Sequence, residues 1–141
     1  MNLLLDTNVV SEWTKPRPDP GLVEWLAELD EDRAYVSVVT LAELRHGVAH
    51  LPRGARRRRL DAWLRHELPQ RFERRVLPVD ERVAEAWGEI VAQRDAIGRP
   101  IGAMDAFIES TAAVHGLAIV TRNVRDFAAS VATVINPWRL G

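Results

Sequence analysis

The chain has 141 residues, of which 47% are hydrophobic and 28% charged, with no cysteine and a formal net charge of -1. This composition fits a soluble globular protein and excludes a disulfide framework, a thiolate metal site and a globally basic nucleic-acid binder. No apolar run approaches the roughly 20 residues of a membrane span, and no basic segment leads into a signal-peptide core. We therefore expect residues 1–141 to form one cytoplasmic domain that makes no membrane contact.

The first predicted element is a strand within Asn2–Asn8, which contains three consecutive leucines. An unbroken apolar run is typical of a strand buried on both faces, as in a parallel sheet covered by helices. The run stops at Asp6, and ligands of open α/β sheets bind beyond the carboxyl ends of the strands. Asp6 therefore lies where such folds perform their chemistry. A short helix is predicted over Thr7–Trp13.

Two helices and a second strand are predicted next. Asp19 is placed to cap a helix that has Pro20 in its first turn and leucines along one face. The apolar, β-branched segment Ala34–Val39 predicts a core strand. It leads directly into a helix predicted from Thr40 to about His50.

The segment from Arg53 to Arg75 carries an excess of positive charge. It contains nine arginines and only three acidic residues, Asp61, Glu67 and Glu73. Apolar residues at helical spacing continue through it. One interpretation is a helical arm with a solvated arginine face. The other is an electrostatic contact for a phosphate backbone or an acidic partner, and the two are compatible.

The last part of the chain alternates strands and helices. Pro78 suggests that its strand lies at a sheet edge, Asp80 is predicted to cap a long helix, and Gly116 to end the next one. The predicted elements are a strand at Val76–Val79, helices after Asp80 and from about Ile101 to His115, and strands at Leu117–Val120 and Val131–Ile135. This alternation predicts an α/β fold with a central, mostly parallel sheet.

Three acidic residues are candidates for chemistry, and each has a structural alternative. Asp6 is placed to cap the following helix, and Glu43 stands three residues after Thr40, which is the spacing of a capping box. Asp105 lies near the start of its helix, where the macrodipole favours a negative charge. Its neighbours are largely apolar, however, and a buried ionised carboxylate needs a partner or a metal.

Two polar residues, Asn123 and Asp126, follow the Leu117–Val120 strand. Either one alone is typical of a turn. Together with the three acidic candidates they could converge on one end of a parallel sheet, where mutual repulsion would raise the carboxyl pKa values unless a cation neutralised them. Oxygen-only ligation favours Mg²⁺ or Mn²⁺ over Zn²⁺, and such an ion suits phosphoryl chemistry.

In their order and spacing, these motifs resemble the PIN-domain ribonucleases, particularly the VapC and FitB-type toxins of bacterial toxin–antitoxin pairs. The likeness covers essentially the whole chain and includes Leu4–Ser11, Thr40–Gly47, Asp105–Ile108 with Thr111-Ala112, Thr121–Phe127 and Asn136–Trp138. The resemblance implies a three-layer α/β/α fold and an Mg²⁺-dependent endoribonuclease site. It also implies homodimerisation and a cognate antitoxin of a type II pair that inserts a basic residue into the acidic pocket.

The resemblance assigns the family's acidic roles to Asp6, Glu43 and Asp105, but the fourth acidic position departs from the pattern. Many relatives have Asp where this chain has Asn123, and others have Asn with an Asp three residues later, as Asp126 is here. Asn123 offers an oxygen without charge, so we expect one firmly held metal ion. Glu109 is a second departure, because relatives often have a small residue there.

The resulting hypothesis is hydrolysis of an RNA phosphodiester. Asp6 and Asp105 would hold Mg²⁺, for which Mn²⁺ can substitute, while Glu43 would orient or deprotonate the attacking water or contact the metal through it. Hydrogen bonds that hold the carboxylates are assigned to Thr7, Asn8 and Thr40. Contacts with the RNA backbone are assigned to Arg99, Arg122 and Arg125.

The sequence raises four alternatives, of which three remain open and one, a phosphotransfer or phosphatase domain, is discounted. His46 and His50, spaced i, i+4 with Glu43 one turn earlier, resemble part of a zinc site. A phosphotransfer or phosphatase domain would need a second acid beside Asp6 or a lysine late in the chain, whereas Lys15 is the only lysine. A PIN-fold binding module would hold a partner's arginine with little catalysis. A housekeeping RNA-processing nuclease would carry the same residues.

Overall fold

All five predicted strands pair in one sheet. In the computed structural model, which describes residues 1–130 and 132–139, the strand order is β3-β2-β1-β4-β5. Every neighbouring pair is parallel, so the sheet is parallel throughout. The strands are β1 (Leu3–Leu5), β2 (Ala34–Ser37), β3 (Val76–Leu77), β4 (Ala118–Val120) and β5 (Val134–Ile135). β3 lies at an edge, as Pro78 predicts.

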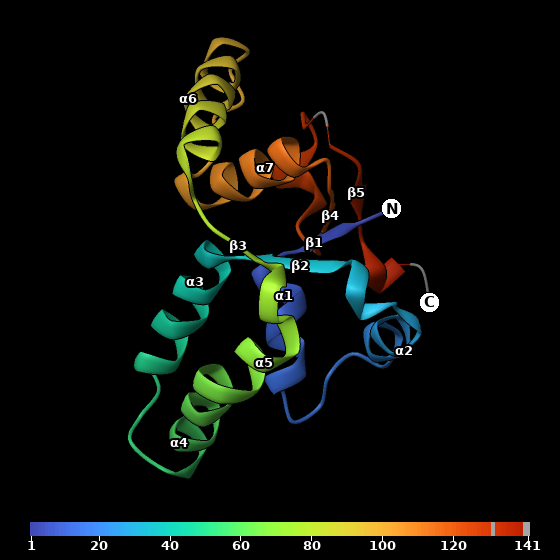
Figure 1. The fold of residues 1–141 in the computed structure, drawn as a ribbon, viewed down its shortest axis with the longest axis vertical. Coiled ribbons are helices and arrows are strands. Elements are labelled where there is room, and N and C mark those ends of the chain that lie inside the picture. Colours follow the sequence, from blue (N-terminus) through green and yellow to red (C-terminus); the bar gives the residue numbers. More distant parts are fainter. Residues whose placement is uncertain (131, 140–141) are drawn as a thin grey trace.

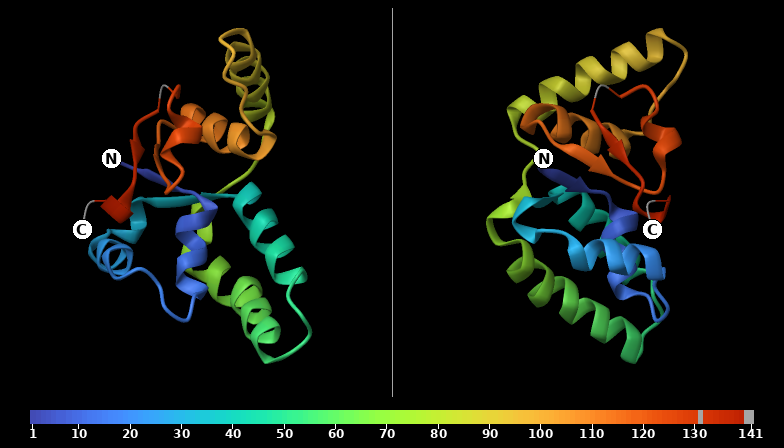
Figure 2. Two further views of the ribbon diagram at one scale, coloured as in Figure 1. Left: turned by 180° about the vertical axis from the view of Figure 1, so that it is seen from behind. Right: turned by 90° about the vertical axis from the view of Figure 1, so that its right-hand side faces the viewer.

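Helices cover both faces of this sheet. In Figure 1, α6 and α7 lie on one face, and α1 to α5 lie on the other. The two further views in Figure 2 show the same three layers. The α-helices are α1 (Thr7–Val10), α2 (Pro20–Glu28), α3 (Val38–Ala49), α4 (Ala55–Ala62), α5 (Leu68–Phe72), α6 (Glu81–Ala96) and α7 (Ala103–His115). The predicted α/β/α architecture is confirmed.

Shorter helical segments connect these elements. A π-helical segment, η3 (Trp63–Glu67), joins α4 to α5. The 3-10 segments are η1 (Ser11–Thr14), η2 (Glu31–Arg33), η4 (Glu73–Arg75), η5 (Val124–Phe127) and η6 (Pro137–Arg139). In the described part of the chain, no helix has both the length and the apolar character that crossing a bilayer requires.

The central strand β1 explains why the chain begins with an unbroken apolar run. Successive side chains of a strand point to opposite faces of the sheet. Leu3 and Leu5 pack into one buried cluster with α2 to α5, while Leu4 packs into a second cluster that includes Ile108 of α7. Both faces of β1 are therefore core, and the strand's next residue, Asp6, emerges at the carboxyl edge of the sheet.

The start of α3 differs from the prediction. The helix begins at Val38, and the Ser37 hydroxyl caps it by accepting the Val39 N–H at 3.0 Å. Thr40 therefore lies inside the helix, and the capping-box interpretation of Glu43 is wrong. The physical reason is that Val38 and Val39 are β-branched and favour a strand locally, whereas the sheet ends one residue earlier.

Other boundaries also shift by a few residues. The helix predicted over Thr7–Trp13 is divided into α1 and η1, and α7 starts at Ala103 rather than near Ile101. Asp19 and Asp80 cap α2 and α6 as predicted. Gly116 ends α7 with a φ of 66°, the left-handed conformation that glycine adopts most readily. Of the strand predicted at Val131–Ile135, Val134–Ile135 forms β5, and Val131 lies outside the described residues.

Several arginines of the arm serve the fold. Arg71 pairs with Glu31 at 2.5 Å, and its guanidinium lies 4.2 Å from the centre of the Trp13 ring. Arg75 donates to the backbone carbonyls of Glu31 and Ala34. These contacts fasten α5 and η4 to the N-terminal half of the chain, so Arg71 and Arg75 make structural contacts here, whereas the first interpretation expected a solvated face.

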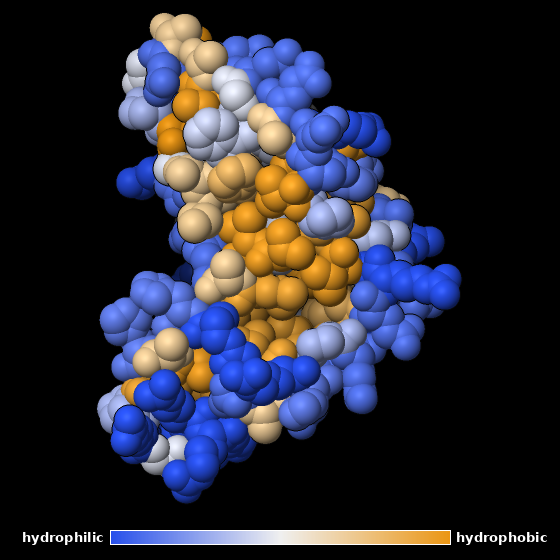
Figure 3. All heavy atoms as spheres, turned by 60° about the vertical axis from the view of Figure 1, so that its left-hand side comes forward, coloured by the Kyte–Doolittle hydropathy of each residue, from blue (hydrophilic) through white to orange (hydrophobic). Residues whose placement is uncertain are grey.

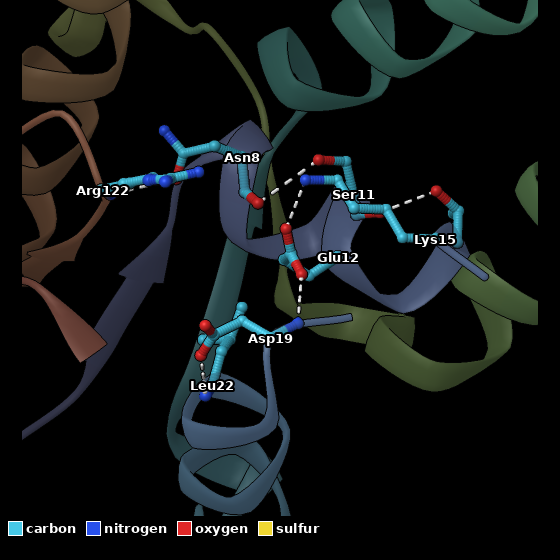
Figure 4. Close-up of polar contacts among 8 residues, drawn as sticks. Asn8, Ser11, Glu12, Lys15, Asp19, Leu22 and Arg122 are labelled. Atoms are coloured by element: carbon cyan, nitrogen blue, oxygen red, sulfur yellow. Dashed lines mark hydrogen bonds and ion pairs between the residues drawn. The ribbon is translucent and has the colours of Figure 1, made fainter. Parts of the chain in front are cut away.

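A buried carboxylate that the sequence does not single out, Glu12, holds the connection between η1 and α2 (Figure 4). It is 3% exposed and accepts hydrogen bonds from Lys15 Nζ at 2.5 Å and from the Asp19 backbone N–H at 2.9 Å. Burial alone would raise the pKa of Glu12, but these hydrogen bonds outweigh it and hold the pKa below its ordinary value. The ionised Glu12 carboxylate therefore stabilises the connection between η1 and α2 by binding residues on both sides of it.

Candidate active site

The carboxylate of Asp6 is fixed by the two strands that meet at the centre of the sheet. Asp6 is 5% exposed, and its backbone N–H continues the β1–β4 pairing by donating to the Val120 carbonyl at 2.9 Å. Oδ1 accepts the Thr7 backbone N–H at 2.8 Å, and Oδ2 accepts the Thr121 hydroxyl at 2.8 Å. Burial nevertheless raises the pKa of Asp6, and the charges of Glu43 and Asp126 push it further in the same direction.

Thr121 is a site residue that sequence reasoning missed. Its side chain is fully buried, and its hydroxyl both donates to Asp6 and accepts the side-chain amide of Asn8 at 3.2 Å. The signal that could have found it is the strand register, because Leu5 pairs with Val120 and the next residues on both strands are therefore neighbours. Asn8 also accepts the Arg122 backbone N–H at 3.1 Å, which ties α1 to the loop after β4 (Figure 4).

Glu43 is linked to α1 by a direct hydrogen bond. The Thr7 hydroxyl donates to Glu43 Oε1 at 2.6 Å, although the two residues are 36 positions apart. The Thr40 hydroxyl lies 3.3 Å from the Thr7 hydroxyl, so Thr40 is linked to the carboxylate through Thr7. The three residues predicted to hold the carboxylates, Thr7, Asn8 and Thr40, therefore all belong to this hydrogen-bonded network.

Asp105 lies in the first turn of α7 and faces a hollow of about 360 Å³. Burial raises the pKa of Asp105 to about 6, with further contributions from the negative charges of Asp6, Asp126 and Glu43. Since these charges come from four separate segments of the chain, the fold gathers the predicted acids at one edge of the sheet. The hollow is lined by Arg94, Arg99, Pro100, Ile101, Gly102, Asp105, Arg125, Asp126, Ala128 and Ala129.

The two candidates for the fourth acidic position are distinguished by their surroundings. Asp126 lines the hollow beside Asp105, and its charge raises the pKa of both Asp6 and Asp105. Asn123 is exposed, as Asp126 is, but it is not part of the lining of the hollow, and its backbone N–H donates to the Thr121 hydroxyl at 3.0 Å. Asn123 also begins the turn that carries Asp126, since its carbonyl accepts the Asp126 N–H.

The three arginines predicted to contact RNA are all exposed, but their positions differ. Arg99 and Arg125 line the hollow with Asp105. The Arg122 guanidinium instead lies 5.5 Å from the centre of the Trp138 ring. Positively charged side chains therefore lie beside the acidic cluster, which would otherwise repel the negatively charged backbone of an RNA.

The donors at this edge fit a hard divalent cation, since they are carboxylate and hydroxyl oxygens. Within residues 1–130 and 132–139, however, no three His, Cys, Asp or Glu side chains lie close enough together to hold an ion as they stand. That finding also applies to the zinc alternative. His46 and His50 place their Nε2 atoms 2.9 Å apart on the exposed face of α3, and the described residues supply no third ligand of these types.

A fully parallel α/β/α sheet with acids from separate segments at its carboxyl edge defines the class of protein. Residues 3–131 match the family model of the PIN domain, and the chain belongs to this family.

Within the family, the chain is one of the VapC and FitB-type toxin ribonucleases. It is 40% identical to toxin FitB of Neisseria gonorrhoeae, over 96% of this chain and 98% of that protein. It is 37% identical to VapC ribonuclease Y4jK of Sinorhizobium fredii, over 96% of this chain and 97% of that protein. The crystal structure of FitAcB from Neisseria gonorrhoeae is similar with a TM-score of 0.93, at 40% identity over 98% of this chain and 99% of that chain.

Proposed function

We propose that this chain is the toxin of a type II toxin–antitoxin pair and that it hydrolyses RNA phosphodiester bonds in an Mg²⁺-dependent reaction. The observation that supports this proposal is that Asp6, Glu43, Asp105 and Asp126 meet at one edge of the sheet, where burial raises the pKa of Asp105 and the other three charges raise it further. A cluster of like charges of this kind is disfavoured unless a cation neutralises it. A cytoplasmic location is proposed with it, because the proposed substrate is RNA.

Asp6 and Asp105 are the carboxylates that would hold the ion, which fits Mg²⁺ with Mn²⁺ as a substitute. Mg²⁺ in proteins usually keeps several of its waters and binds through one or two carboxylates, so a site with fewer than three direct acidic ligands suits it. When bound, such an ion supplies charge stabilisation for the phosphoryl oxygens and a water of lowered pKa.

The chain's own residues then orient the reaction. Glu43, held by the Thr7 hydroxyl at 2.6 Å, is the group that would orient or deprotonate the attacking water. Asp6 is kept in place by Thr121 and by the Thr7 backbone N–H. Asp126, beside Asp105, is a further candidate ligand or charge neighbour. Fixed hydrogen bonds of this type usually affect affinity or activity 10–100-fold.

Arg99 and Arg125 are proposed to contact the RNA backbone beside Asp105, because both line the hollow. We expect Arg125→Gln to weaken RNA binding and to reduce the steepness of its salt dependence by about 0.7, the contribution of one phosphate contact on a single strand. Fluorescence anisotropy of a labelled RNA in EDTA, from 50 to 300 mM salt, measures this slope. Arg82→Gln is the control, because Arg82 is exposed on α6 and lies outside both the lining of the hollow and the arginine-rich arm, and equal slopes for the two variants would contradict the assignment.

A groove beside Glu43 is proposed as the place where the antitoxin binds. The groove, of about 290 Å³, begins at Thr7 and Glu43 and continues between apolar side chains of α3 and the arm, including Leu44, Val48 and Trp63. An antitoxin segment with apolar side chains and one basic residue would fit this groove, with the basic residue directed at the carboxylates. Binding would then compete with catalysis at the same place.

We also propose that the chain forms a homodimer through an exposed hydrophobic surface. Figure 3 shows hydrophobic side chains gathered across the middle of one face, above the hydrophilic lower end of the molecule. Exposed contiguous apolar area of this kind typically marks an interaction site. Large hydrophobic side chains that are more than a third exposed in the described part of the chain include Val38, Val79 and Met104.

The test of the proposed function is cleavage of single-stranded RNA by the purified chain. We expect cleavage with Mg²⁺ or Mn²⁺, none with EDTA, and arrest of bacterial growth on expression that a cognate antitoxin relieves. A chain that binds the antitoxin but cleaves no RNA would instead be a binding module. Cleavage without growth arrest would indicate a housekeeping nuclease.

A further inference from the structure

A buried arginine stands at the junction of the two helices that cover one face of the sheet. Arg94, near the end of α6, is 7% exposed, and its Nη1 lies 3.5 Å from Oε1 of the equally buried Glu109 on α7. Neither residue has a role in the chemistry proposed above. Removing two charges from water costs free energy that their attraction does not always return. The pair is therefore expected to have a role other than holding the two helices together.

The other donors of Arg94 reach two separate backbone segments. Nε donates to the Arg99 carbonyl at 3.1 Å, in the connection between α6 and α7. Nη2 donates to the Asp126 carbonyl at 2.8 Å, in η5. Arg94 also lines the hollow that contains Asp105. One guanidinium therefore joins α7, the α6–α7 connection and the turn that carries the fourth acid.

We propose that Arg94 is a positioning residue of the nuclease site, which holds the backbone of Arg99 and Asp126 beside Asp105, with Glu109 as its buried counter-charge. This inference rests on the proposed function for its catalytic consequence and on the hydrogen bonds alone for its structural one. Glu109 thereby has a role that does not make it part of the acidic pocket.

The geometry requires an arginine. The guanidinium is a planar fork with five N–H donors in fixed directions, whereas the lysine ammonium is a compact point charge on a flexible stem. The segments that Arg94 holds are short, and η5 is also anchored by the buried side chain of Phe127. η5 is a single turn, and its backbone bonds include Asp126 N–H to the Asn123 carbonyl at 3.1 Å and Ala128 N–H to the Arg125 carbonyl at 3.3 Å.

The experiment compares R94M, R94K, E109Q and the double variant R94M/E109M with the unmodified chain. Its three measurements are amide hydrogen exchange over residues 97–101 and 124–128, the thermal midpoint, and kcat and KM for a single-stranded oligoribonucleotide with Mg²⁺. R82M is the matched control, because Arg82 is an exposed arginine on the same helix.

For R94M we expect exchange at least tenfold faster in both segments, a midpoint lower by about 10 °C, and kcat/KM lower by at least tenfold. R94K should show nearly the same three changes as R94M. The double variant separates the effect on stability from the effect on the site, because an apolar pair often replaces a buried ion pair without loss of stability. Its midpoint should return to within a few degrees, while fast exchange and low kcat/KM remain.

If hydrogen exchange and kcat/KM of the double variant equal those of the unmodified chain, the proposal is overturned, since the pair would then serve packing alone. If the unmodified chain cleaves no RNA, the proposed function fails, but the exchange measurement still decides the positioning role. In that case, unchanged exchange over both segments in R94M would overturn it.

Discussion

Asp105→Asn is expected to abolish RNA cleavage, with a loss of at least about a thousandfold in kcat/KM, because it removes one of the two carboxylates proposed to hold the ion. The same change should make the metal-free protein more stable at pH 8. Asn has nearly the same shape as Asp but carries no charge, so it removes both causes of the raised pKa of Asp105, which are burial of the charge and the repulsion from Asp6, Asp126 and Glu43. The measurements are single-turnover cleavage with Mg²⁺ and thermal unfolding in EDTA.

The pH dependence of this stabilisation follows from the direction of the shift. The pKa of Asp105 is raised from 3.8 to about 6 on folding, so the folded state binds the proton more tightly than the unfolded state. Stability that is present near pH 4 is therefore lost as the pH rises through about 6. The gain in stability of Asp105→Asn over the unmodified chain should be small at pH 4 and should reach its full size by pH 7.

The matched control is Asp95→Asn, the same substitution at an exposed position on α6. It should leave cleavage and the pH profile of the thermal midpoint unchanged. A variant with Asn at 105 that cleaves RNA normally, or that is destabilised equally at pH 4 and pH 8, would contradict this account of the acidic cluster.

Thr121→Val is expected to reduce kcat/KM by 10–100-fold and to destabilise the fold by about 1.5–3 kcal/mol. Valine has nearly the same shape as threonine, but it cannot donate to Asp6 Oδ2 at 2.8 Å or accept the Asn8 amide at 3.2 Å. The buried carboxylate then loses one of its two close hydrogen bonds and is free to turn away from its working orientation. Steady-state cleavage and urea unfolding measure the two effects.

Thr111→Val is the control for that substitution. Thr111 is also fully buried, but its hydroxyl donates to the Phe107 carbonyl within its own helix at 2.7 Å. It should change stability with little effect on kcat. If the two valine variants lose activity in proportion to their loss of stability, Thr121 would have no specific role at the site.

The fold could be predicted from local signals because the strands are short apolar runs and the helix ends carry their own caps. Asp19, Asp80 and Gly116 act within a few residues of their own position, and each is found as predicted. Asp6 was recognisable for the same reason, since it directly ends a buried strand.

Features that depend on distant parts of the chain could not be predicted in the same way. α3 begins at Val38 because the sheet ends at Ser37, although two consecutive valines favour a strand locally. The contact between Thr121 and Asp6 depends on the pairing of β1 with β4, and that between Arg94 and Glu109 on the packing of α6 against α7. The choice of Asp126 over Asn123 as neighbour of Asp105 likewise requires the turn geometry of η5.

Calorimetric titration of the metal-free chain with Mn²⁺ tests the central claim most directly, namely that the gathered carboxylates form a site for one divalent ion. We expect one Mn²⁺ per chain in the unmodified protein and in Asp95→Asn, and loss of binding in both Asp6→Asn and Asp105→Asn. Unchanged Mn²⁺ binding in those two variants, or no binding by the unmodified chain, would contradict the account.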